Sequence, residues 1–259
     1  MNEAGDTPHQ IVELLAAIPD QDSAERWTLI RALQQRADRP ALAAALEAAA
    51  SPDPLRAAAG VDVLAQFGVT ADSGGPFRGE RLAAVLAVAD RAGSGGGEAS
   101  AGLLASALIA LGHLKDGKAQ LPLLRSLSHS DPWVRYAVAF ALPLVTDAAD
   151  PAPDVVAALV TLTTDADDEV RNWAVFGLGR LLDADTSQIR TALAARLDDP
   201  DPGTAEEALL GLAKRCDPGA LERLRVRLEG VPSNMAAELA DLMERGGEFD
   251  GVDSVLQRD

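Results

Sequence analysis

Apolar stretches alternate with short polar turns along most of this 259-residue chain. Within each stretch the apolar positions recur every three or four residues, which is typical of an α-helix with one buried face. The turns are rich in Asp, Pro and Gly, residues that start and end helices. The pattern predicts helical hairpins at 8–36, 39–67, 79–112, 117–145, 152–182, 186–215 and 218–245. Residues 246–259 are polar and are expected to form a C-terminal tail.

The second helices of these hairpins repeat one frame. A mostly small apolar residue lies three positions after a shared starting column, and a larger one lies seven positions after it. The column holds Arg26, Arg56, Leu104, Arg135, Arg171 and Ala205. Self-similarity of this kind indicates stacked repeats. We therefore predict an all-α fold, a right-handed α-solenoid (an α-α superhelix) of about seven hairpins that forms a single domain over residues 1–245.

Two copies of the frame carry a family resemblance. Residues 131–142 and 167–178 both read Asp-x-x-Val-Arg, followed seven positions later by Leu. They resemble HEAT repeats of the short bacterial kind, related to the phycobilisome-lyase HEAT-like repeats. The resemblance implies that the first helices form a convex wall and the second helices line a concave face. It also implies a ladder between neighbouring repeats, made by Asp131, Arg135, Asp167 and Arg171.

Five of the nine aromatic residues lie on two successive second helices. Trp133, Tyr136 and Phe140 recur at helical spacing on a face distinct from the buried one. Two interpretations stay open for such residues, since they can fill the core or line a groove that anchors a peptide or helix of a protein partner. The candidate partner-binding residues are Trp133, Tyr136, Phe140, Asn172, Phe176 and Arg180.

The net charge of −17 narrows the range of partners. It argues against sequence-independent binding of nucleic acid and against anionic membrane surfaces, because both need clustered Lys and Arg. It favours a protein partner with basic segments. No stretch of about 18 apolar residues and no secretory signal is visible, and Cys216 is the single cysteine. We expect a monomeric bacterial protein of the cytoplasm.

Catalytic and metal-binding patterns are absent from the sequence. The three histidines are far apart, at 9, 113 and 129, and no Cys-x-x-Cys or His-x-x-x-His spacing occurs. We therefore expect no cofactor, no metal and no catalytic residue, and we interpret the protein as a non-catalytic scaffold or adaptor that holds a partner with basic or amphipathic-helical segments on its concave face. The alternative is a lyase-like or chaperone-like protein that binds a small ligand or chromophore in the 133–176 aromatic region.

Overall fold

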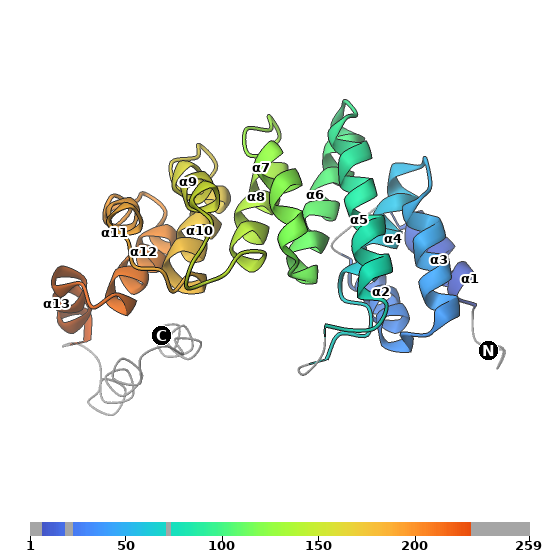
Figure 1. Ribbon diagram of the computed structural model, residues 1–259, viewed down its shortest axis with the longest axis horizontal. Coiled ribbons are helices and arrows are strands. Elements are labelled where there is room, and N and C mark those ends of the chain that lie inside the picture. The colour runs from blue at the N-terminus through green and yellow to red at the C-terminus, as the bar shows by residue number, and fades with distance from the viewer. Residues whose placement is uncertain (1–6, 19–22, 71–73, 229–259) are drawn as a thin grey trace. The chain divides into compact units, whose positions relative to one another are not determined.

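The computed structural model describes residues 7–18, 23–70 and 74–228 (Figure 1). This described part of the chain contains α-helices joined by turns and no β-strand, so the predicted all-α class is confirmed. Contacts between residues divide the chain into two compact units, Met1–Thr146 and Asp147–Asp259. The single domain over residues 1–245 stays a prediction.

Unit 1 (residues 1–146) is a stack of helical hairpins. Its helices are α1 (Pro8–Ala17), α2 (Ala24–Arg36), α3 (Arg39–Ala49), α4 (Pro54–Ala65), α5 (Arg78–Gly93), α6 (Glu98–Leu114), α7 (Gln120–Arg125) and α8 (Pro132–Ala141), with short 3₁₀ turns at Gly117–Ala119 and Leu142–Leu144. The second helices α4, α6 and α8 pack side by side, and the first helices α3, α5 and α7 follow one another along the other side. The hairpins predicted from the apolar pattern therefore start and end within a few residues of the observed ones.

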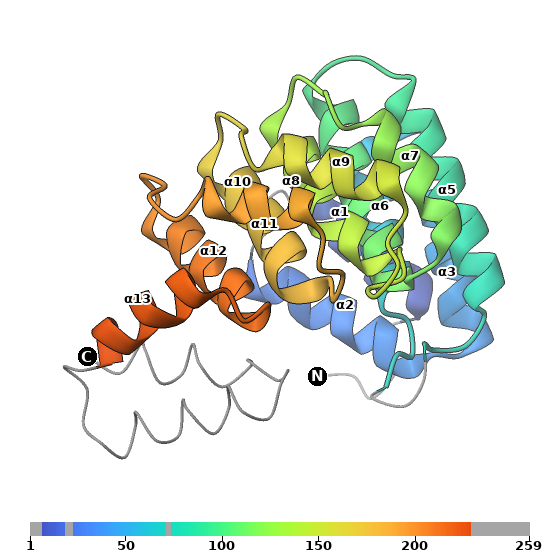
Figure 2. The ribbon, with the colours of Figure 1, turned by 60° about the vertical axis from the view of Figure 1, so that its left-hand side comes forward.

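Unit 2 (residues 147–259) repeats the arrangement. Its helices are α9 (Pro153–Leu162), α10 (Asp168–Phe176), α11 (Ser187–Ala194), α12 (Pro202–Lys214) and α13 (Pro218–Leu228), with a π-helical turn at Gly177–Leu181 after α10. The second helices α10 and α12 pack on each other, and α13 packs on α12 (Figure 2). The second half of the hairpin predicted at 218–245 and the predicted tail lie outside the described residues.

Acidic turns start the second helices. The carboxylates of Asp53, Asp131, Asp167 and Asp201 each accept a hydrogen bond from a backbone N–H in the first turn of the helix that follows. Three of these helices also have Pro in the first turn, where its missing N–H costs nothing. Asp was expected to cap these helices, and the structure confirms it.

Small residues let the second helices approach closely. Ala59, Ala107, Ala174 and Ala208, which stand three positions after the shared column, are all fully buried. A Cβ atom added at Gly60 of α4 would lie 2.4 Å from the backbone nitrogen of Ala49 in α3, so these two helices pack with no side chain between them.

The first helix corrects one expectation. The sequence spacing predicts that Ile11, Leu14, Leu15 and Ile18 all turn inward. Ile11 and Leu15 are buried, together with Val12, but Leu14 is 48% exposed, so for this residue the prediction was wrong. Helix α1 contacts α2, α3 and α4, and none of these contacts covers Leu14.

Candidate functional site

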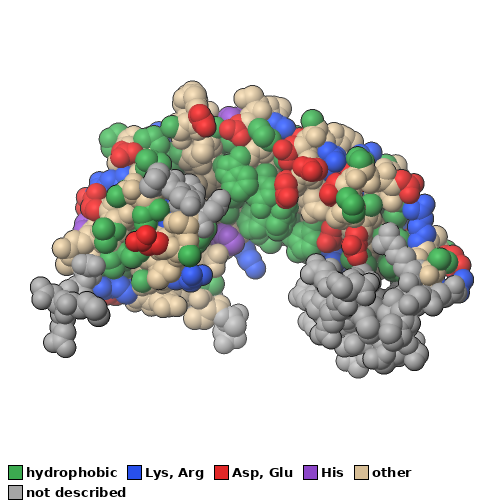
Figure 3. Space-filling model, turned by 180° about the vertical axis from the view of Figure 1, so that it is seen from behind, with side chains coloured by type: hydrophobic (Ala, Val, Ile, Leu, Met, Phe, Trp, Pro, Cys, Tyr) green, Lys and Arg blue, Asp and Glu red, His purple; other side chains and the backbone are tan. Residues whose placement is uncertain are grey.

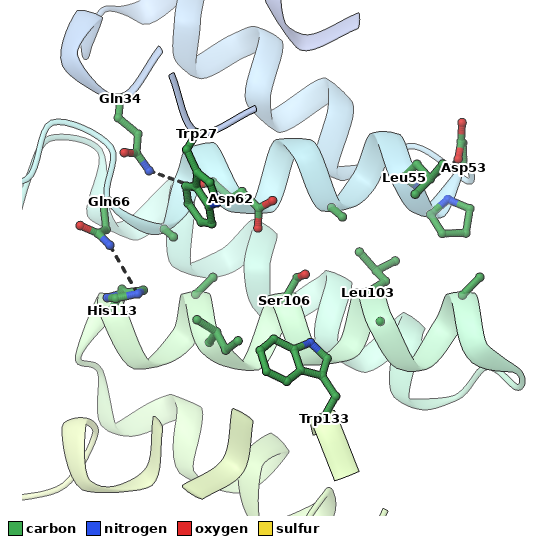
Figure 4. Close-up of a pocket in the computed structure, with 17 residues that line it drawn as sticks. Trp27, Gln34, Asp53, Leu55, Asp62, Gln66, Leu103, Ser106, His113 and Trp133 are labelled. Atoms are coloured by element: carbon green, nitrogen blue, oxygen red, sulfur yellow. Dashed lines mark hydrogen bonds between the residues drawn. The ribbon is translucent and has the colours of Figure 1, made fainter. Parts of the chain in front are cut away.

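An apolar groove lies within unit 1, between the second helices. Helices α2, α4 and α6 and the first turn of α8 line it, and it encloses about 590 Å³ (Figure 4). That volume lies within the ~300–1,000 Å³ typical of ligand-binding clefts. The space-filling view in Figure 3 shows hydrophobic side chains gathered in a hollow of the surface, with charged side chains around it.

The groove follows from the same repeat frame as the core. On α4 its lining includes Leu55, Ala58, Asp62 and Ala65, and on α6 it includes Leu103, Ser106, Ala110 and His113. Both sets stand one position before and two, six and nine positions after the shared column. This spacing describes one stripe along each helix, next to the buried stripe three and seven positions after the column. The second helices thus pack through one stripe and line the groove with the other.

Large apolar side chains stand exposed around the groove. Trp27 of α2 is 43% exposed, Leu55 of α4 is 48% exposed and Trp133 of α8 is 50% exposed. Isolated exposed apolar residues are ordinary, but three that line one concave surface are typical of an interaction site.

The ion pair of Arg26 and Asp62 contributes one carboxylate to the groove lining. Arg26 of α2 is buried, and its guanidinium donates to the carbonyl oxygen of Leu15, 3.2 Å away, and to the Oδ2 atom of Asp62. Burial raises the pKa of Asp62 to about 6, even though the positive charge of Arg26 and its hydrogen bond act in the opposite direction. The pair ties α1, α2 and α4 together and leaves a carboxylate in a largely apolar surface.

Gln66 and His113 form a polar cluster where the groove reaches the C-terminal ends of α4 and α6. The side-chain nitrogen of Gln66 lies 3.4 Å from Nε2 of His113, and the imidazole packs edge-on against the ring of Phe140, with 5.4 Å between centroids. Burial lowers the pKa of His113, and the nearby charge of Lys115 lowers it further. His113 is therefore neutral at pH 7 and adds no charge to the groove.

The structure brings one predicted partner-binding residue into this groove. Trp133 lines it and stacks on Tyr136, with ring centroids 4.5 Å apart and planes at 12°. Tyr136 and Phe140 are half-buried. Phe140 does not line the groove, but its ring contacts His113, which does. These two aromatics are therefore neither fully buried core residues nor fully exposed anchors.

The other predicted partner-binding residues lie in unit 2. Phe176 packs edge-on against Trp173 at 5.4 Å, and the guanidinium of Arg180 lies 5.8 Å from the Phe176 ring. Arg180 is also 3.5 Å from the carboxylate of Glu207. Asn172 of α10 lies against the start of α12, because its Nδ2 atom would be 2.9 Å from a Cβ atom added at Gly203. A ligand site shared by residues 133–176 stays a prediction.

The residues of the predicted ladder make the following contacts. Asp131 and Asp167 cap α8 and α10, and Arg135 donates to the carbonyl oxygens of His129 and Ser130 in its own turn. Arg171 also binds carbonyl oxygens in its own turn, and it makes two further hydrogen bonds of 3.1 and 3.3 Å to Asp199 in the next repeat. Within unit 2 the turns of two repeats are therefore joined through Arg171 and Asp199.

Reasoning from the sequence missed Trp27, Leu55 and Asp62. The signal that identifies them is the second stripe of α4 and α6, which is visible once the copies are aligned on the shared column. Within the described residues no group of three His, Cys, Asp or Glu side chains could hold a metal ion. No helix in the same part of the chain is long and apolar enough to cross a membrane.

Comparison with known proteins supports the repeat assignment. A family model for HEAT repeats matches residues 97–179 and 155–240, which together make up more than half of the chain. Protein YibA of Escherichia coli K12 is 31% identical over 116 residues, which are 45% of this chain and 38% of that protein. The matched segment thus spans well under half of the length of this curated relative.

Solved structures show the same fold. The X-ray structure of E. coli YibA matches with a TM-score of 0.59 and 20% identity, over 88% of this chain and 82% of that one. The archaeal HEAT-like repeats protein from Thermococcus onnurineus NA1 matches with a TM-score of 0.51 and 19% identity, over 97% and 99% of the two chains. At these identities the likeness concerns the fold alone.

Proposed function

We propose, from the premise that this chain belongs to the HEAT-repeat family, that it is a non-catalytic binding module whose unit 1 groove holds an amphipathic helix of a protein partner. The observation that carries the proposal is the apolar lining of α4 and α6, with Trp27, Leu55 and Trp133 exposed around it. Exposed Trp side chains over an apolar cleft are the residues that most often dominate binding energy between proteins.

The chemistry of the walls favours a helical occupant. The groove is built from helices, whose backbone N–H and C=O groups are bonded within each helix. An extended peptide in the groove would leave its own backbone groups without partners in a largely apolar site, at a cost for each group. A helix satisfies its backbone internally and presents only side chains, which is the basis of helix-in-groove recognition.

The length of the groove also suits a helix. Its lining on α4 runs from Pro54 to Gln66, roughly 18 Å at the helical rise of about 1.5 Å per residue. About three turns of a partner helix match that length, and apolar residues at its i, i+3, i+4 and i+7 positions would face the groove.

A selection experiment tests this function. A displayed library of 14-residue helical peptides, randomised on the apolar face, is selected against the full chain. The affinities of the enriched peptides are then measured by fluorescence anisotropy. We expect the double variant Trp27→Ala/Trp133→Ala to weaken binding at least tenfold, because two large contact surfaces are lost. Leu121→Ala is the matched control, since Leu121 is 57% exposed on α7 and does not line the groove.

The opposite results would overturn the proposal. These are a selection that enriches no peptide, or enriched peptides that bind the double variant as tightly as the wild type. Circular dichroism of each variant shows whether the helices are intact. Both tryptophans are about half exposed, so their replacement is expected to leave the fold in place.

A further inference from the structure

The charges that line the groove all have the same sign. The lining includes two carboxylates, Asp53 and Asp62, and neither Lys nor Arg stands among the residues that form it. The remaining polar side chains, those of Gln34, Gln66, Ser106 and His113, are neutral at pH 7. An occupant with a positive charge therefore complements this surface, and an occupant with a negative charge does not.

The two carboxylates differ in what holds them in place. Asp53 is at the start of α4, and its Oδ1 atom accepts the N–H of Leu55, so helix capping accounts for it. Asp62 lies in the last turn of the same helix, where the helix dipole disfavours a carboxylate and no backbone N–H is free to bind it. Capping therefore does not explain the carboxylate of Asp62.

Of the two members of the ion pair, Asp62 and not Arg26 is exposed to the groove. The side chain of Arg26 is 1% exposed, whereas that of Asp62 is 19% exposed, so the groove meets the carboxylate and not the guanidinium. Oδ2 takes the hydrogen bond from Arg26, and Oδ1 accepts none from the rest of the described chain. Figure 4 shows the carboxylate between α4 and α6, close to Trp27.

We propose that the helix held in this groove carries an Arg or Lys whose cationic head pairs with Asp62 beside Trp27; the inference rests on the proposed function. A neutral apolar helix would cover the carboxylate and remove its remaining water with nothing in exchange, which costs affinity. A cation supplies a charge-assisted hydrogen bond to Oδ1, and the indole of Trp27 adds a cation–π contact. Asp62 thus selects among apolar helices those with one basic residue in register.

The peptide selected above is the probe for this pairing. Selection against the wild type is expected to enrich Arg or Lys at one position of the apolar face, and selection against Asp62→Asn is not. The most enriched peptide is then synthesised with Arg and with its neutral isostere citrulline. We expect the wild type to bind the Arg peptide at least tenfold more tightly than the citrulline peptide, and Asp62→Asn to reduce that ratio to below about twofold.

Two protein variants control for charge and folding. Asp53→Asn removes the other carboxylate of the groove but keeps a good helix cap, so the preference for Arg over citrulline should stay tenfold. In Asp62→Asn the side-chain carbonyl oxygen still accepts from Arg26, which favours a folded variant. The comparison of the two peptides on the wild type needs no variant.

The experiment distinguishes failure of the pairing with Asp62 from failure of the proposed function. If both peptides bind the wild type equally and Trp27→Ala still weakens them, the pairing with Asp62 is wrong and the proposed function stands. If the binding of neither peptide responds to Trp27→Ala/Trp133→Ala, the proposed function itself is wrong. Sedimentation velocity tests the remaining occupant: self-association that Trp27→Ala abolishes would replace the partner helix by a second copy of this chain.

Discussion

Units 1 and 2 share a repeat frame but differ in net charge and in how their buried carboxylates are held. Unit 1 has 16 acidic and 12 basic residues, a net charge of −4, whereas unit 2 has 24 and 11, a net charge of −13. The stripe that lines the apolar groove on α4 and α6 holds Glu207 and Lys214 on α12, where Lys214 lies 2.7 Å from Asp183. The frame that packs the helices thus leaves the second stripe free to differ, and that stripe decides what each unit presents.

One acidic residue from each unit shows the contrast in the direction of its pKa shift. Burial raises the pKa of Asp62 in unit 1 to about 6, and its single partner Arg26 does not outweigh burial. Burial also acts to raise the pKa of Asp199 in unit 2. Hydrogen bonds from Arg171 and from the Asp201 amide, with the charges of Arg171 and Arg196, outweigh it and lower the pKa. The charged form is destabilised in the first case and stabilised in the second.

The largest effect is expected from Arg215 of unit 2. Its buried guanidinium donates to the carbonyl oxygens of Leu178, Gly179, Leu182, Ala184 and Gly211, at 2.8 to 3.2 Å. Arg215→Met removes this shared donor, although the Leu182 oxygen keeps Lys214 Nζ at 3.3 Å, and the free energy of unfolding should fall by at least about 3 kcal/mol. Urea unfolding followed by the fluorescence of Trp173, with Trp27 and Trp133 changed to Phe, measures the loss in unit 2.

A matched surface change calibrates that result. Arg223 is 50% exposed and lies 3.2 Å from Asp198, which is 87% exposed. Arg223→Met should therefore change stability by less than about 0.5 kcal/mol. Equal effects of the two substitutions would contradict a specific role for Arg215 at the end of the second helices.

Asp62 gives the second largest effect, and it depends on pH. A folded pKa of about 6, above the ordinary 3.8, means that the stability from the neutral form is complete below pH 3.8 and is lost as pH rises through 6. Relative to Asp62→Asn, the wild type should lose up to about 3 kcal/mol across this range. Urea unfolding at pH 3.5 to 7.5, followed by Trp27 fluorescence, measures the difference.

Asp199→Asn is the matched variant with the opposite sign. The folded pKa of Asp199 is lowered, so the stability from its charged form is present above the ordinary pKa and is lost as pH falls through the folded value. Relative to Asp199→Asn, the wild type should therefore gain stability as pH rises from acid. Parallel pH profiles for the two Asn variants would contradict the contrast between the units.

The sequence predicted the parts of this structure that depend on local chemistry. Asp131 caps its helix and Ala174 is buried because capping and helical periodicity act over a few residues. Helical spacing also put Trp133 on a face apart from the buried one, and it is exposed in the groove; its role in binding stays a prediction. Asp62 and Trp27 were missed because the sequence does not show which neighbouring helix lies opposite a residue outside the buried stripe. Leu14 was misplaced for the same reason, since the contacts of α1 decide which of its apolar residues are covered.

Two glycines in the second helices give a smaller contrast. A Cβ atom added at Gly211 of α12 would lie 2.5 Å from Cα of Gly179 and 3.1 Å from Leu193, so Gly211→Ala should destabilise unit 2 by about 1–3 kcal/mol. Gly102 of α6 has nothing within 4 Å, so Gly102→Ala should stabilise unit 1 by about 0.5–1 kcal/mol through helix propensity. Thermal unfolding of each variant gives the sign, and a stable Gly211→Ala protein would contradict the close contact between α12 and the π-helical turn Gly177–Leu181.

The smallest effect concerns the contact between repeats in unit 2. The side chain of Arg171 is 12% exposed and that of Asp199 is fully buried, so their two hydrogen bonds are little screened by water. A double-mutant cycle with Arg171→Met and Asp199→Asn should give a coupling of about 1 kcal/mol at pH 7. The exposed pair Arg223 and Asp198 should give less than about half of that. Acid reduces the first coupling, because Asp199 becomes neutral below its folded pKa, so a coupling unchanged at pH 3 would mean that packing of the Arg171 side chain, and not its charge, joins the two repeats.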